Sequence, residues 1–231
     1  MKIEDVIYSE KKFLPVLVYK GTMQSYDNEN MEFKFRESSR DTPYFIHELV
    51  NSITKEKFGL PLRNLIFGTS DYNHADSYGN AHIITPIGKW RAFVSPEVQD
   101  MTIENGFSDY FLGVKLEGML RENNKRIDES ILRYVFSHSL KKIRSFDDAM
   151  DSISDRLKNM LKDQTEEFPI EYIDSLIEKF RLDVLEDIRS YTDSIIEVNS
   201  NTSKSVFDND PEVMIYAPEG YNLRLSRSSD L

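Results

Sequence analysis

The 231-residue sequence contains no cysteine, and its four histidines never form the His-Glu-x-x-His pattern of zinc hydrolases. Disulfide bonds, thiolate nucleophiles and cysteine metal sites are therefore excluded, and a reducing compartment is permitted. We expect no metal site, and we assign no chemistry to the histidines.

Long apolar runs are also missing. No stretch approaches the roughly 18 to 20 apolar residues that span a bilayer, and the opening MKIEDVIYSEKKF lacks the apolar core of a signal peptide. The glycine motifs of nucleotide-binding folds and the Gly-x-Ser-x-Gly elbow are absent as well, which lowers the weight of NTPases and hydrolases. A cytoplasmic protein is the default expectation.

Positive charge is in deficit, since the formal net charge is −11 and the isoelectric point is about 4.9. A protein that neutralises many phosphates needs a concentrated basic surface, so we expect no extended nucleic-acid interface. An acidic surface would instead bind a basic partner. The chain length suits one substantial core rather than two independent domains.

The first hundred residues read as mixed sheet and helix. The segments FLPVLVYK and MEFKFR predict two strands around the turn-like SYDNEN. Between Asp41 and Gly59 the apolar residues recur at helical spacing, with Pro43 suited to the first helical position. The segments NLIF, AHIITPI and WRAFV then predict strands through about Val98.

The pattern is helical and strongly charged from about residue 127 to residue 198. After it, VMIY and YNLRL flank the turn-former APEG and predict a hairpin. We therefore predict an α+β fold, with an N-terminal sheet and helix part (1–120), a helical insertion (121–200) and returning strands of the first domain (201–231).

Arg36 ends the strand-like MEFKFR, where its rigid guanidinium could hold a phosphate or a ribose edge. The alternative for Arg36 is a solvated arginine at a strand end, which surface statistics favour when the residue is taken alone.

The stretch FGTSDYNHADSYGN brings two hydroxyls, on Thr69 and Ser70, to the corner between an expected strand and an expected helix. Ser70 or Asp71 can cap that helix, and the free amides at its start can also receive a ligand. Tyr72 and Tyr78 share one helical face, which can stack a planar ligand or simply pack on the sheet.

Glu212 opens the expected strand VMIY. A carboxylate there can accept hydrogen bonds from a ribose and stabilise a cationic sugar transition state. The alternative is an edge charge that discourages aggregation between sheets.

Taken in order, Arg36, the Thr69-Ser70 corner and Glu212 resemble the ADP-ribosyltransferase superfamily. In that family a first-strand arginine or histidine, a central strand with Ser, Thr or an aromatic residue, and a late-strand glutamate surround NAD. The segment from Asp41 to Asp100 also looks like phage-encoded proteins with that fold. The resemblance covers about the first hundred residues and the last twenty.

The resemblance implies a split sheet that grips NAD, and transfer of ADP-ribose to a host protein or nucleic acid in the host cytoplasm. It implies that Arg36 binds the NAD phosphate or ribose, that Thr69 and Ser70 order the site, and that Glu212 stabilises the oxocarbenium ion. Tyr72 or Tyr78 would stack on nicotinamide.

Two departures from the family pattern leave alternatives open. Arginine-modifying members carry Glu or Gln two residues before the catalytic Glu, where this chain has Asp210, so the type of acceptor stays open. Arg40 also competes with Arg36 for the role of the first-strand arginine. The alternative functions are a non-catalytic acidic protein that binds a basic host surface, and a virion component with an inactive transferase fold.

Overall fold

A computed structural model describes residues 16–37, 42–98, 107–136, 140–199 and 201–226. The chain divides into two compact units, which we name the sheet unit and the helical unit. The sheet unit comprises Met1–Glu37, Asn64–Asp100 and Asp193–Leu231, and the helical unit comprises Ser38–Arg63 and Met101–Thr192. These units cut the chain differently from the predicted ranges, because the segment Ser38–Arg63 groups with the later helices.

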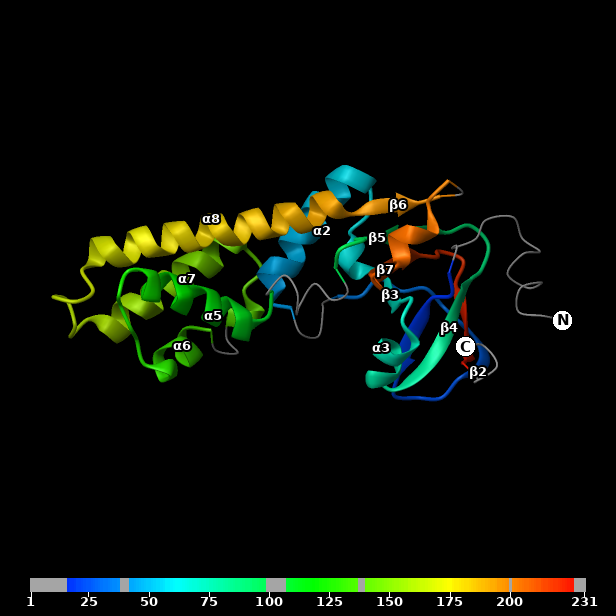
Figure 1. The fold of residues 1–231 in the computed structure, drawn as a ribbon, viewed down its shortest axis with the longest axis horizontal. Helices are drawn as coiled ribbons and strands as arrows, with labels where there is room; N and C mark the ends of the chain where they lie inside the picture. Colours follow the sequence, from blue (N-terminus) through cyan, green and yellow to red (C-terminus); the bar gives the residue numbers. More distant parts are fainter. Residues whose placement is uncertain (1–15, 38–41, 99–106, 137–139, 200, 227–231) are drawn as a thin grey trace. The chain divides into compact units, whose positions relative to one another are not determined.

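The described part of the sheet unit holds one eight-stranded sheet in the order β2-β8-β4-β1-β3-β7-β5-β6 (Figure 1). Every pairing is antiparallel, which confirms the α+β class. The strands are β1 Tyr19–Thr22, β2 Asp27–Met31, β3 Ile66–Thr69, β4 Asn80–Pro86, β5 Arg91–Val94, β6 Ile196–Val198, β7 Glu212–Tyr216 and β8 Tyr221–Leu225.

The second predicted strand is misplaced. The strand β2 begins at Asp27 and ends at Met31, so it uses the polar residues that resemble a turn, while MEFKFR continues beyond it. A polar strand is tolerated here because β2 is an edge strand, paired to β8 alone, and its first four residues are exposed. Asn28 has a positive φ of 67°, at the point where the register with β8 shifts.

The predicted terminal hairpin is wrong, although both of its strands exist. The strand β7 pairs with β3 and β5, whereas β8 pairs with β4 and β2. The link contains Gly220, whose φ of 103° suits glycine, and it carries the chain from one half of the sheet to the other. Local turn signals cannot distinguish this crossing from a hairpin.

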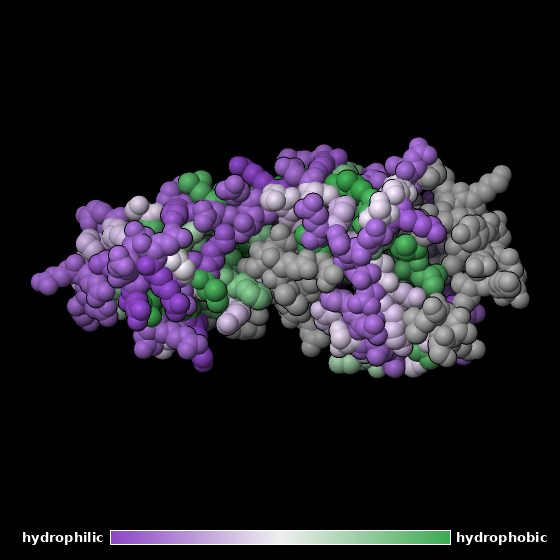
Figure 2. All heavy atoms as spheres, viewed as in Figure 1, coloured by the Kyte–Doolittle hydropathy of each residue, from purple (hydrophilic) through white to green (hydrophobic). Residues whose placement is uncertain are grey.

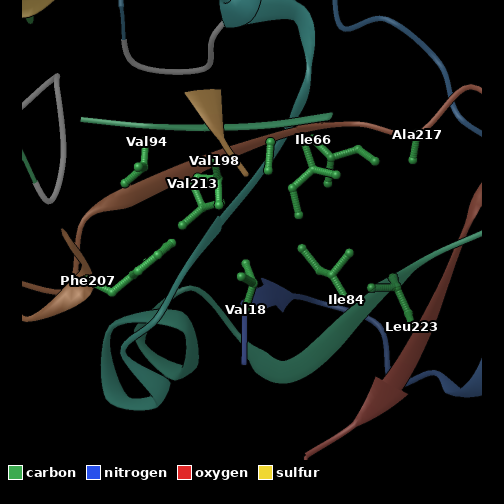
Figure 3. Packing of buried hydrophobic residues seen from close by; sticks show 11 residues of the cluster. Val18, Ile66, Ile84, Val94, Val198, Phe207, Val213, Ala217 and Leu223 are labelled. Carbon is green, nitrogen blue, oxygen red and sulfur yellow. The ribbon is translucent and has the colours of Figure 1, made fainter. Parts of the chain in front are cut away.

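Apolar side chains from both halves of the sheet meet in one core (Figure 3). Val18, Ile84 and Leu223 point toward Ile66 and Val213 from the opposite half, so the sheet curls around its own core. The two halves join where β1 pairs with β3 through the single registered pair Tyr19 and Thr69, while the other edge of β1 pairs with β4 over four residues.

The short helix α3 (Tyr72–Ser77) packs on β1 and β4 (Figure 1). Its close approach depends on Gly21, because a Cβ at that position would overlap the carbonyl oxygen of Ala75. Ala75 is itself buried against Tyr19, Ala81 and Ile83.

The described part of the helical unit contains α2 (Tyr44–Phe58), which confirms the helix predicted between Asp41 and Gly59. Gly59 ends this helix in the left-handed conformation with φ 75°, where glycine has no steric penalty. The later helices are α5 Asp109–Glu122, α6 Glu129–Val135, α7 Phe146–Leu161 and α8 Ile170–Ser194, of which α8 reaches two residues into the sheet unit. Polar side chains cover most of the helical surface on the face drawn in Figure 2.

No helix within the described ranges is long and apolar enough to cross a membrane.

Candidate functional site

The predicted corner and the predicted glutamate lie side by side. In the sheet, β3 lies between β1 and β7, and Thr69 is the register partner of Tyr19 on one side and of Glu212 on the other. Directly opposed residues on antiparallel strands project from the same face, with Cβ atoms about 5 Å apart. The hydroxyl of Thr69 and the carboxylate of Glu212 therefore leave the sheet together.

Two hydroxyls hold the turn that leads into β7. The Thr69 hydroxyl donates to the carbonyl oxygen of Asp210 (3.3 Å), and the Ser70 hydroxyl donates to the Asp210 carboxylate (3.2 Å). Asp210 adopts a positive φ of 51°, a strained region for most residues that Asp tolerates better. Thr69 and Ser70 therefore position Glu212 by tying down the backbone two residues before it.

Glu212 is half-buried at the first position of β7. Its backbone N–H donates to the carbonyl oxygen of Val98 (3.0 Å), which pins the start of the strand. β7 is also an interior strand, between β3 and β5, so the edge-charge explanation for Glu212 does not apply.

Of the two possible caps, Asp71 caps α3, because its carboxylate accepts the backbone N–H of Asn73 (2.8 Å). The Thr69 hydroxyl in turn accepts the backbone N–H of Asp71 (3.1 Å). Ser70 thus remains with Asp210 and takes no part in the cap.

The two candidate tyrosines have different surroundings. Tyr72 packs edge-on against Tyr19 with ring centroids 5.8 Å apart, beside buried Ala75. Tyr78 is 48% exposed, and its ring centroid lies 5.4 Å from that of His74. Tyr72 therefore fits the packing explanation, and Tyr78 is the one with a ring accessible to a ligand.

Arg36 lies beyond the end of β2 rather than on a strand, so its predicted place at a strand end is wrong. Its backbone N–H donates to the carbonyl oxygen of Asn64 (2.8 Å), and its guanidinium carbon lies 5.0 Å from the ring centroid of Phe67. Phe67 and Thr69 are two residues apart on β3, so their side chains share a face. Arg36 thus reaches the face that carries Thr69 and Glu212. Arg40 lies outside the described residues.

The first strand carries a further cation, Lys20, which is not among the predicted site residues. Burial, and then the Arg36 guanidinium, lower the pKa of Lys20 to about 8. Lys20 leaves β1 on the face opposite to Tyr19, just past the pair that joins β1 to β3. The available signal was its place at the end of the predicted strand FLPVLVYK, next to Gly21.

Three aromatic rings meet where the segment that carries Arg36 lies beside β7. Phe35 stacks on Tyr216 with centroids 6.1 Å apart and ring planes 20° apart, and Phe33 meets both rings edge-on. Phe35 is 48% exposed. Tyr216 shares its face of β7 with Glu212, four residues away, so a planar surface lies at the far end of the same strand.

No cluster of three or more potential metal ligands occurs among the residues that the structure describes. Comparison with known proteins adds no relative: no family model matches the chain, and neither the curated proteins nor the solved structures contain a match.

Proposed function

We propose that the protein is an NAD-dependent ADP-ribosyltransferase that modifies a host macromolecule and is encoded by a phage. The observation that carries the proposal is the direct opposition of Thr69 and Glu212 on β3 and β7, beside β1. This agrees with the family pattern of a hydroxyl on a central strand and a glutamate on a late strand. The thin β1–β3 junction also suits a split sheet of ADP-ribosyltransferase type.

In this proposal the carboxylate of Glu212 accepts a hydrogen bond from the nicotinamide ribose and stabilises the oxocarbenium ion. Arg36 binds a phosphate of NAD, and its contact with Phe67 holds the guanidinium on the Glu212 face. Thr69 and Ser70 order the site through Asp210. Tyr78 provides a ring for nicotinamide. Lys20 leaves β1 on the face opposite to Tyr19, Thr69 and Glu212, so the proposal gives it no contact with NAD.

The reaction breaks the bond between the ribose C1′ and the nicotinamide nitrogen, and nicotinamide leaves with the electron pair. The acceptor nucleophile then forms a bond to C1′ and loses its proton to solvent. Positive charge develops on the ribose, so a fixed carboxylate stabilises the transition state more than the ground state.

The test is release of nicotinamide from NAD by the purified chain, together with transfer of labelled ADP-ribose to proteins or nucleic acids of a host lysate. Glu212→Gln removes the negative charge at nearly constant shape, and we expect activity to fall by about 100-fold or more. The control is Glu97→Gln, an exposed carboxylate of the same unit, which should retain full activity. Absence of NAD binding and of nicotinamide release in the unmodified chain would refute the proposal.

The non-catalytic alternatives stay predictions. Several carboxylates of the acidic helix α8 are already paired within the helical unit: Asp187 with Lys115 (2.8 Å) and Asp174 with Lys158 (2.5 Å). Such pairs leave less charge for a basic partner. Salt-sensitive capture of one basic host protein, with no NAD turnover, is the result that would favour an acidic binding protein.

A further inference from the structure

A cavity of about 450 Å³ lies in the helical unit, lined by residues at the end of α5 and in the loop before α6. This volume falls within the range of small-molecule sites. None of its lining residues belongs to the candidate site on the sheet. The lining residues are Glu117, Arg121, Asn124, Lys125, Arg126 and Ile127.

The cavity is basic in an acidic protein. Three of its six lining residues are cations and one is a carboxylate, although the whole chain carries a formal charge of −11. Glu117 forms an ion pair with Arg121 across one helical turn (2.6 Å). Lys125 and Arg126 have no ion pair within the described part of the chain, so about two positive charges remain without a counter-charge.

Lys125 is held in place by aromatic rings rather than by a carboxylate. Its Nζ atom lies 5.5 Å from the ring centroid of Phe168 and 5.9 Å from that of Tyr172. Such contacts orient an ammonium group and leave its charge uncompensated. The Tyr172 hydroxyl is buried without a hydrogen-bond partner, and burial raises the pKa of Tyr172, so this hydroxyl keeps its proton.

Lys125 and Arg126 follow each other in the turn that ends α5. Asn124 takes a positive φ of 55°, and the N–H groups of Asn124 and Lys125 donate to the carbonyl oxygens of Arg121 (2.9 Å) and Leu120 (2.9 Å). The carbonyls of Leu120 and Arg121 are therefore occupied by the loop itself, and the cations of Lys125 and Arg126 remain for another acceptor.

We propose that this cavity binds the phosphate group of a small phosphomonoester such as a sugar phosphate. A doubly charged phosphate matches the two uncompensated cations, and the planar fork of Arg126 donates two parallel hydrogen bonds to phosphate oxygens. The ammonium of Lys125 supplies a point charge, and the side-chain amide of Asn124 can donate to a further oxygen. Ile127 gives the cavity an apolar wall for the carbon part of the ligand. The negative charge of the rest of the chain repels anions elsewhere.

The test is calorimetric titration of the full chain with ribose 5-phosphate, inorganic phosphate and ribose, each at low and high salt. Ribose 5-phosphate lacks the adenine and nicotinamide rings, so a result here is independent of NAD turnover. We expect binding of ribose 5-phosphate, no binding of ribose, and weaker binding at high salt. Equal binding of inorganic phosphate identifies free phosphate as the ligand source and supports the site, whereas absence of phosphate-dependent binding overturns it.

Arg126→Gln and Lys125→Met should each weaken the binding of ribose 5-phosphate by about tenfold, since each removes one charge-assisted contact. Arg126 is exposed, so Arg126→Gln should keep the unfolding temperature of the parent chain. Lys162→Gln removes an exposed lysine at the end of α7 and is the matched control. An unchanged affinity in Arg126→Gln, or an equal loss in Lys162→Gln, overturns the proposal.

Discussion

Thr69 and Glu212 lie directly opposite each other on the neighbouring antiparallel strands β3 and β7. The Thr69 hydroxyl also donates to the carbonyl oxygen of Asp210 (3.3 Å) and accepts the backbone N–H of Asp71 (3.1 Å). One buried hydroxyl therefore joins the start of α3 to the turn before Glu212. Its loss should disturb both stability and the orientation of the glutamate.

Replacing Thr69 by Val keeps the shape of the side chain and removes the hydroxyl. We expect the free energy of unfolding to fall by about 1 to 3 kcal/mol, because the Asp71 N–H and the Asp210 carbonyl lose a buried partner. Chemical denaturation measures the change. Thr69→Ser keeps the hydroxyl and should recover most of the loss, and equal stability of Thr69→Val and the parent chain would show that neither hydrogen bond matters.

The lowered pKa of Lys20 predicts a pH dependence. The folded chain releases this proton near pH 8, whereas the unfolded chain holds it up to the ordinary value of 10.5. Above pH 8 the unfolded state therefore binds more protons, and raising the pH stabilises the fold through this group. Lys20→Met removes the buried charge, so its stability advantage over the parent chain should be largest at pH 7 and shrink toward pH 9.5, by up to about 1 kcal/mol per pH unit.

Denaturation of both chains at several pH values between 7 and 9.5 measures the difference. Lys162→Gln changes an exposed lysine and should show a constant difference from the parent chain. A constant difference for Lys20→Met as well would mean that Lys20 titrates normally.

Tyr72 at the start of α3 and Tyr78 at its end should differ in effect, since we expect the first to contribute to stability and the second to NAD binding. Tyr72→Ala removes a ring packed on Tyr19, and we expect a loss of about 2 kcal/mol in the free energy of unfolding. Tyr78→Ala removes an exposed ring and should change stability by less than about 0.5 kcal/mol, while NAD affinity falls. Unchanged NAD affinity in a folded Tyr78→Ala would remove Tyr78 from the proposed site.

Gly21→Ala tests the contact between β1 and α3. The added Cβ would overlap the Ala75 carbonyl oxygen and approach the Tyr78 Cβ to 2.7 Å, so either the helix or the strand must shift. We expect a loss of about 1 to 3 kcal/mol, as for other overpacked positions. Gly118→Ala is the matched control: it lies within α5 with nothing within 4 Å of the added Cβ, and it should stabilise by about 0.5 to 1 kcal/mol.

Helices and turns could be predicted where the contacts that decide them join residues close in sequence. The helix α2 follows from apolar spacing between Pro43 and Gly59, and the corner after β3 follows from Gly68, Thr69 and Ser70. The opposition of Thr69 and Glu212 needs a strand pairing across more than 140 residues, which no local pattern contains.

The missed features have the same physical origin. The edge strand β2 carries a polar sequence because neither of its faces is fully buried, so no apolar alternation marks it. The burial of Lys20 could not be predicted, because it depends on how the sheet curls and a lysine at a strand end is ordinarily exposed to solvent.

The crossing of the chain between β7 and β8 has a consequence for folding during synthesis. The edge strand β2 joins the sheet through β8 alone, and β5 and β6 join it through β7. A nascent chain that has not yet emerged beyond Pro211 therefore lacks both connections and lacks Glu212. The complete eight-stranded sheet can form only after translation has passed Leu225, and Glu212 takes its place opposite Thr69 in that same late stage of synthesis.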